Sequence, residues 1–231
     1  MPATLALVAQ SSTSADGATV GSTALAGWTV GRIAVAELAV SGGSGTTVTP
    51  PTGFTLLYRV DQGTTVSKLV YTKTVDAATM DCRFAMSPNA SAVLHMIQVA
   101  GGNPNSQAAS YASADNVSST SQPLPMYTTG RPMAEVLAGV AEGIASTYTT
   151  PTGWTEFAVG SSSGGASNNV SLHTFHKREP VPVSAPSVED VAGTAGAGAV
   201  GVLVVADDAG QIERFLTLDV PDRMSLVLAV A

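Results

Sequence analysis

The sequence predicts an all-β protein: a two-sheet antiparallel β-sandwich, made from two related half-repeats and followed by a C-terminal β extension. Three observations support this fold class. Short apolar runs rich in Val, Ala, Leu and Thr alternate with clusters of Gly, Pro, Ser and Asn, as in a sandwich or barrel. No long stretch combines a helical period with good helix formers. The chain also resembles itself at a spacing of about a hundred residues, so two similar units follow one another.

The predicted strands are apolar runs bounded by turn-forming residues. They span residues 33–40, 68–75, 92–100, 133–140, 170–175 and 200–206. The clearest predicted turns are the glycine- and serine-rich segments 41–45, 101–104 and 161–165.

The internal repeat rests on four matches that keep their order along the chain. PTGFT at 51–55 returns as PTGWT at 151–155, an offset of 100. Three weaker matches pair 31–37 with 130–135, 66–73 with 170–177, and 90–93 with 197–200, at offsets of 99, 104 and 107. The first of these places Glu37 and Glu135 in related positions, which indicates a shared structural role.

Each repeat offers about four clear strands, and a sheet with one apolar face needs a partner sheet to cover it. We therefore expect residues 1–206 to form one sandwich, with half-repeats at about 1–118 and 119–206, and residues 207–231 to form an extension.

The repeated segments resemble a jelly-roll-type β-sandwich domain found in bacteriophage virion proteins and in some secreted bacterial surface proteins. The likeness lies in Ala26-Gly27-Trp28, in 31–36, in the PTGFT and PTGWT turns, and in 69–73 and 90–102. It implies a jelly-roll-like fold and a structural role as a capsid decoration or as a tail or fibre component. The family has no catalytic signature to carry over.

Charge and cysteine content narrow the function classes. The formal net charge is −7, with 10 Lys and Arg against 17 Asp and Glu and no basic cluster, so we expect no nucleic-acid partner. A single cysteine, Cys82, excludes an internal disulfide and a cysteine-based zinc site. The N-terminus does not resemble a signal peptide, and no apolar run approaches the roughly 20 residues of a membrane span.

No motif in the sequence predicts catalysis, a cofactor or a metal. Residues 196–201 match G-x-G-x-x-G, but a strand-like segment follows where a dinucleotide site needs a helix. His173 and His176 would point to opposite faces of a strand. Trp28, Phe54 and Trp154 are candidate sugar-stacking aromatics, although the repeat relating Phe54 to Trp154 favours core packing. The chain is therefore predicted not to be an enzyme.

Assembly is the favoured role. Several strands, such as 33–40, are apolar on both faces, and an apolar outer face usually marks an interface. The extension 207–231 is predicted to be an assembly arm. Its candidate interface residues are Phe215, Leu216, Leu218, Leu226 and Leu228.

The leading hypothesis is a non-enzymatic structural protein of a bacteriophage virion, assembled in the host cytoplasm. Its expected partners are other copies of itself and other virion proteins, with a host surface glycan as a further candidate. The alternative is a secreted, extracellular carbohydrate-binding β-sandwich module of a bacterium.

Overall fold

The fold was analysed in a computed structural model of the chain. The structure describes residues 4–13, 17–100, 108–113, 119–124, 134–144, 147–162, 169–180, 190–196 and 198–205. Over these residues the regular structure is antiparallel β, apart from the short 3-10 turn η1 (Gly43–Gly45). The all-β antiparallel sandwich expected from the sequence is confirmed. The predicted extension and its five candidate interface residues lie outside the described residues.

The first half contains one large and two small sheets. The large sheet has the strand order β1-β10-β4-β7-β6, made of β1 (Thr4–Thr13), β10 (Ala92–Ala100), β4 (Ile33–Ser41), β7 (Val66–Thr74) and β6 (Thr55–Gln62). The small sheets are β2-β9-β5 and β3-β8, made of β2 (Thr19–Val20), β9 (Phe84–Ser87), β5 (Thr47–Thr49), β3 (Leu25–Ala26) and β8 (Thr79–Met80).

The second half repeats this topology. Its large sheet has the order β11-β18-β13-β16-β15, made of β11 (Ala108–Ser113), β18 (Gly198–Val205), β13 (Ala134–Glu142), β16 (Val170–Glu179) and β15 (Thr155–Ser162). Its small sheet, β12-β17-β14, consists of β12 (Ser119–Pro123), β17 (Asp190–Gly196) and β14 (Tyr148–Thr149). Because β11 pairs with β18, the division between the halves falls between Ala100 and Ala108, and not at residue 118.

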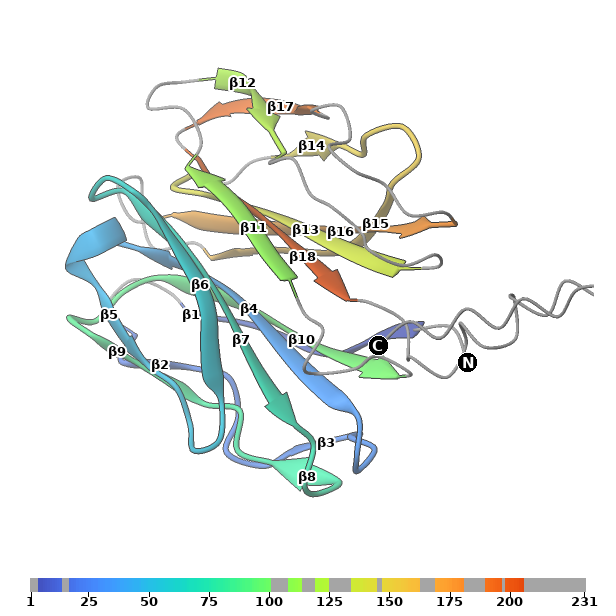
Figure 1. The fold of residues 1–231 in the computed structure, drawn as a ribbon. Coiled ribbons are helices and arrows are strands. Elements are labelled where there is room, and N and C mark those ends of the chain that lie inside the picture. Colours follow the sequence, from blue (N-terminus) through green and yellow to red (C-terminus); the bar gives the residue numbers. More distant parts are fainter. Residues whose placement is uncertain are drawn as a thin grey trace, which may run out of the picture.

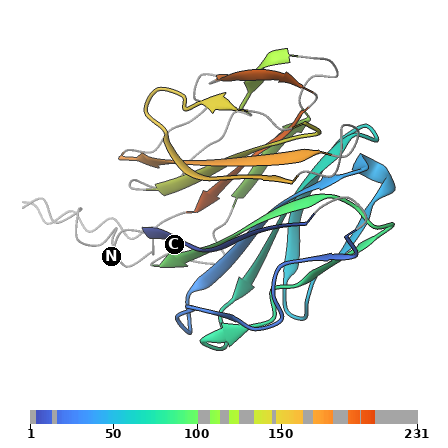
Figure 2. The same ribbon diagram turned by 180° about the vertical axis from the view of Figure 1, so that it is seen from behind.

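The sheets stack in layers, with the two large sheets face to face in the middle and the small sheets outside (Figures 1 and 2). Strand β1 lies against β15, β6 lies against β11, and β4 crosses β13 at the centre. Exchanging each strand for its counterpart in the other half leaves this set of contacts unchanged. The halves are therefore related by an approximate two-fold axis near the crossing of β4 and β13.

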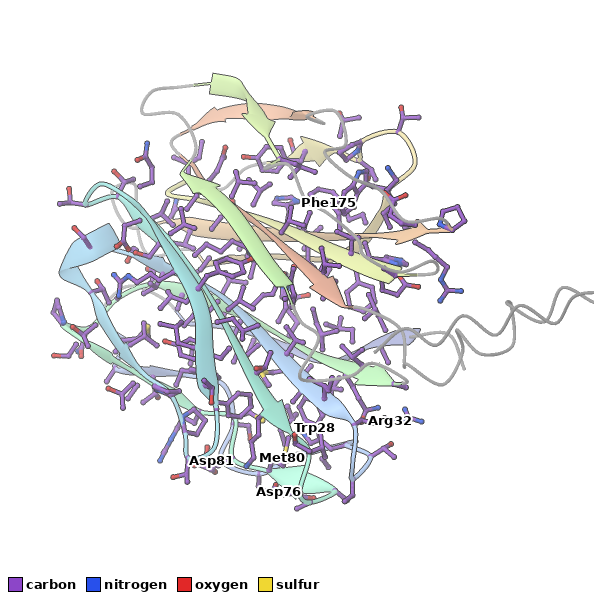
Figure 3. All side chains as sticks on the ribbon, in the orientation of Figure 1. Trp28, Arg32, Asp76, Met80, Asp81 and Phe175 are labelled. Atoms are coloured by element: carbon purple, nitrogen blue, oxygen red, sulfur yellow. The ribbon has the colours of Figure 1, made fainter. Side chains whose placement is uncertain are left out.

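The hydrophobic core is divided among three clusters. One fills the first half and includes Trp28 and Met80, and another fills the second half and includes Phe175 (Figure 3). The third lies between the two large sheets. Each half therefore has its own pair of layers and its own core, and a further apolar layer joins the halves.

Stacking the halves explains the strands that are apolar on both faces. On β4, Ile33 and Val35 belong to the cluster between the halves, whereas Ala34 and Leu38 belong to the core of the first half. All nine residues of β4 are buried, and so are all nine of β13. These apolar faces are covered inside the chain, so they do not indicate an interface with another molecule.

Strand pairing also corrects the repeat. Lys73 and Lys177 lie over the aromatic rings that follow the two PTG turns, which aligns β7 with β16. Glu37 and Gly139 each pair with the residue that lies three positions before the lysine of the neighbouring strand. The counterpart of Glu37 is therefore Gly139 and not Glu135. The sequence comparison had placed the counterpart of Glu37 four residues too early on β13, at a position on the same face of the strand but farther along it.

The repeated turn brings its aromatic residue into the core. Gly53 has φ 90° and Gly153 has φ 83°, as the third position of a type II turn requires. The N–H groups of Phe54 and Trp154 donate to the carbonyl of the proline three residues earlier, at 3.3 and 3.0 Å. Phe54 is 7% exposed and Trp154 is 6% exposed. Each turn therefore places the aromatic ring that follows it in the interior of its half.

Candidate functional site

A polar cluster lies between the two large sheets, inside the apolar layer that joins the halves. We call its five members, Glu37, Tyr58, Lys68, His95 and Thr174, the interhalf cluster. Four come from the first half and Thr174 comes from the second. Thr174 and the three ionisable members other than Tyr58 are 0% exposed, and Tyr58 is 4% exposed. A buried ionisable group is costly unless it has a hydrogen-bonding or charged partner, so the contacts of each member are described in turn.

Lys68 is the cation of the cluster. Its Nζ lies 3.1 Å from Oε1 of Glu37 on the neighbouring strand. The same atom donates to the hydroxyl of Tyr58 at 2.7 Å and lies 5.0 Å from the centre of that ring. An ammonium group with a carboxylate and a phenol as partners is neutralised and hydrogen-bonded, as a buried charge must be.

Thr174 connects the two sheets. Its hydroxyl donates to Oε2 of Glu37, and its oxygen lies 2.9 Å from Nδ1 of His95. The single hydroxyl proton is used on Glu37, so Nδ1 of His95 must carry the proton that Thr174 accepts. A chain of polar contacts therefore runs from Lys68 through Glu37 to Thr174 on the opposite sheet, and returns to His95.

Burial determines the protonation states. Desolvation raises the pKa of Tyr58 to about 12, although the Lys68 cation opposes this. Burial alone would lower the pKa of Lys68, but Glu37 and Tyr58 outweigh that effect and raise it. Desolvation lowers the pKa of His95 to about 4, and the nearby Glu37 only partly counteracts this. At neutral pH the cluster therefore contains a lysine cation, a neutral phenol and a neutral imidazole.

Three glycines of the second half make room for these side chains. A methyl group added at Gly139 would lie 2.3 Å from Cε of Lys68, and one at Gly201 would lie 2.5 Å from Cε2 of Tyr58. One at Gly160 would lie 2.4 Å from Cγ1 of Val93 and 3.1 Å from Nε2 of His95. Glycine in a strand interior often marks a place where another chain segment approaches closely. Gly139 and Gly201 therefore each receive a large polar side chain of the first half, and Gly160 receives Val93 beside His95.

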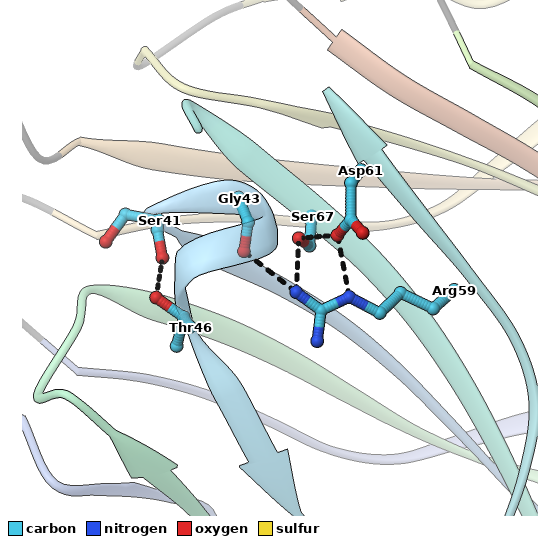
Figure 4. A network of polar contacts seen from close by, with 6 residues as sticks. All are labelled: Ser41, Gly43, Thr46, Arg59, Asp61 and Ser67. Carbon is cyan, nitrogen blue, oxygen red and sulfur yellow. Dashed lines mark hydrogen bonds and ion pairs between the residues drawn. The ribbon is translucent and has the colours of Figure 1, made fainter. Parts of the chain in front are cut away.

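A second polar network fixes the connection between β4 and β5 onto β6 and β7 (Figure 4). The guanidinium group of Arg59 donates to Asp61 at 2.6 Å, to the carbonyl of Gly43 at 2.8 Å and to Ser67 at 3.2 Å. Ser67 donates in turn to Asp61. Unlike the interhalf cluster, this network joins elements within one half, and Arg59 and Asp61 are partly exposed.

A shallow cleft opens on the first half beside the first PTG turn. Its lining consists of Ile33, Gly53, Thr55, Thr72, Lys73, Thr74 and Asp76. Nζ of Lys73 lies 3.1 Å from Asp76 and donates to the carbonyl of Thr52 at 3.3 Å. Three hydroxyls and one ion pair therefore surround the cleft, without an exposed aromatic face.

The three candidate aromatics are not part of an exposed platform. Trp28 and Phe54 pack in the core of the first half, and Trp154 packs in the core of the second. Their burial leaves no free ring face on which a sugar could stack.

The structure also places the other motifs. A strand, β18, follows Gly196 within the G-x-G-x-x-G segment, so there is no helix N-terminus there to hold a phosphate. His173 contacts Tyr148 on one side of β16, whereas His176 contacts Phe157 on the other. Within the described residues, no group of three His, Cys, Asp or Glu side chains is arranged to hold a metal.

Sequence reasoning missed the interhalf cluster. A signal was present in the sequence, because Glu37 and His95 each interrupt an apolar run and Lys68 directly precedes one. A charged residue at such a position must find a buried partner. The partners could not be named, because Thr174 and the glycines belong to a repeat whose alignment required the observed register.

Comparison with known proteins gives no identification: no family model, curated protein or solved structure matches the chain. A search of the described residues for a helix that is both apolar and long enough to cross a bilayer finds none.

Proposed function

We propose that the protein is a non-enzymatic structural protein of a bacteriophage virion, exposed on the particle as a capsid decoration or as a tail or fibre component. The burial of the interhalf cluster supports the proposal that the protein is not an enzyme. Glu37, Lys68 and His95 are the ionisable side chains best suited to chemistry, and all three are 0% exposed and held in contacts that join the halves. A substrate would have to separate the two sheets to reach them.

The virion part of the proposal rests on the resemblance of the repeated motifs and on the low charge content. Only 12% of the residues are charged, about half the usual share for a soluble domain. Such a surface suits a protein covered largely by neighbours. The expected partners are other copies of the chain and other virion proteins.

Exposed apolar side chains on edge strands favour contact with neighbouring molecules. Leu7 on β1, Leu56 on β6 and Val159 on β15 are 40%, 46% and 42% exposed. Each of these strands lies at the edge of a large sheet. An edge strand presents unpaired backbone groups, and exposed apolar side chains beside them strengthen its tendency to join another chain.

Immunogold electron microscopy of purified particles tests the proposal. Antibodies raised against the recombinant chain should label intact virions at regular positions on the capsid or the tail. Mass spectrometry of the same particles should detect the chain at a fixed ratio to the major capsid protein. Particles that carry neither label nor peptide would contradict a virion role.

Glycan binding is a second candidate, favoured by the cleft of threonine hydroxyls and the Lys73–Asp76 pair. Hydroxyls and charged groups are suitable partners for sugar hydroxyls. A glycan array probed with the wild-type chain and with Thr72→Val would test it. Retention of a glycan by wild type, with loss in Thr72→Val, would support this function, whereas no retention by either chain would exclude it for the arrayed sugars.

A further inference from the structure

The two large sheets meet through one face each, and we call these two surfaces the pairing faces. We infer that the pairing faces are complementary to each other and not to themselves. Each half therefore accepts the other half, in its own chain or in a second copy, and rejects a half of its own kind. This inference does not depend on the proposed virion role.

The approximate two-fold axis makes the comparison possible. In a pair of like halves with the same arrangement, a second copy of one half would take the place of the other half. Each residue of the replaced half would then be exchanged for its counterpart. Gly139 is the counterpart of Glu37, and a methyl group at Gly139 would already lie 3.1 Å from Oε1 of Glu37. A pair of first halves would bring a second Glu37 to this place, burying two carboxylates against each other.

Steric conflict adds to the charge repulsion. Gly201 is the counterpart of His95, since these residues lie opposite Gly139 and Glu37 in their sheets. The ring of Tyr58 packs so closely on Gly201 that an added methyl group would lie 2.6 Å from its hydroxyl. In a pair of first halves, an imidazole would stand where only a hydrogen atom now fits.

A pair of second halves fails for the opposite reason. In such a pair Gly139 would face Leu172 in place of Lys68, whereas Gly201 would face Ala158 in place of Tyr58. The space now filled by the Tyr58 ring against Gly201 would then be empty. Cavities in a packed interior lose both burial and dispersion contacts. The Thr174 hydroxyl would also lose its acceptor, Glu37.

Within the interhalf cluster, the large polar groups are therefore all on the face of the first half, and Gly139 and Gly201, which receive Lys68 and Tyr58, are on the face of the second. Buried polar groups are known to select among alternative pairings by making the wrong ones unfavourable. Where many copies of the chain are concentrated together, this difference would keep each half with its correct partner.

Co-expression of the two halves tests the inference with every residue of the chain present. Residues 1–104 are produced in two forms with different affinity tags, together with untagged residues 105–231. Either tag should retain the second half at 1:1, and should retain the first half bearing the other tag at less than a tenth of that amount. Comparable retention of like and unlike halves would overturn the inference.

A double substitution in the full-length chain gives an independent answer if the separate halves are insoluble. Gly201→Ala should lower the midpoint of thermal unfolding in the wild type. In Tyr58→Ala, the same change should lower the midpoint by less than half as much, because the ring it would meet is gone. Equal decreases in both backgrounds would refute the matched pairing of Gly201 with Tyr58.

Gly45→Ala is the matched control for that cycle. Gly45 has open space around its missing Cβ, with no atom within 4 Å. Its substitution should leave the unfolding midpoint unchanged in both backgrounds.

Discussion

Replacing Lys68 with Met should destabilise the protein far more than the loss of a surface ion pair. The side chains have similar length, so the change removes the charge and leaves the volume nearly constant. Nζ lies 3.1 Å from Glu37, and at an effective dielectric constant of 20 that separation corresponds to about 5 kcal/mol of attraction. Without this partner, the buried Glu37 carboxylate is left uncompensated, which costs roughly 3–5 kcal/mol.

Urea unfolding followed by linear extrapolation at pH 7 measures the difference in free energy. Lys73→Met is the matched control on the same strand, because Lys73 pairs with Asp76, whose side chain is 65% exposed. We expect it to cost under about 1 kcal/mol. The double variant Lys68→Met with Glu37→Gln should recover part of the loss, since no buried charge remains. If Lys68→Met lowered the free energy of unfolding no more than Lys73→Met does, the buried Lys68–Glu37 pair would not be needed for stability, and the reasoning would be refuted.

Three further predictions follow from burial and hydrogen bonding. Trp154→Ala and Phe54→Ala should each cost about 3–5 kcal/mol in urea unfolding, the range for emptying a core aromatic site, and an unchanged unfolding midpoint would contradict their core role. Thr174→Val removes the donor to Glu37 and should cost about 1–3 kcal/mol, whereas Thr174→Ser, which keeps the hydroxyl, should cost less. Burial lowers the pKa of His95 from its ordinary value of 6.5 to about 4, so the full contribution of its neutral form to stability is present above pH 6.5. That contribution, about 3 kcal/mol, should be lost as the pH falls from 6.5 to 4, and His95→Gln should flatten this part of the stability curve if the interpretation is correct.

The local structure of the chain could be predicted from the sequence, because it depends on neighbouring residues. Apolar runs between turn residues predicted β4, β7, β10, β13, β16 and β18, each close to its observed position. The PTG turns could be recognised as equivalent because glycine at the third position permits a positive φ. The aromatic residue after each turn was expected to pack in the core, and in the structure its side chain is buried.

The layer arrangement and the interhalf cluster were decided only by tertiary structure. A strand that is apolar on both faces shows that both faces are covered, but not by which part of which molecule. Glu37 was matched with Glu135 in sequence, and only the strand register showed that its counterpart is Gly139. Contacts such as that of Glu37 with Thr174 join residues 137 positions apart, on sheets whose packing no local pattern specifies. Local propensity therefore determined the strands and turns, whereas the stacking of two sandwiches determined which polar side chains are buried and what they contact.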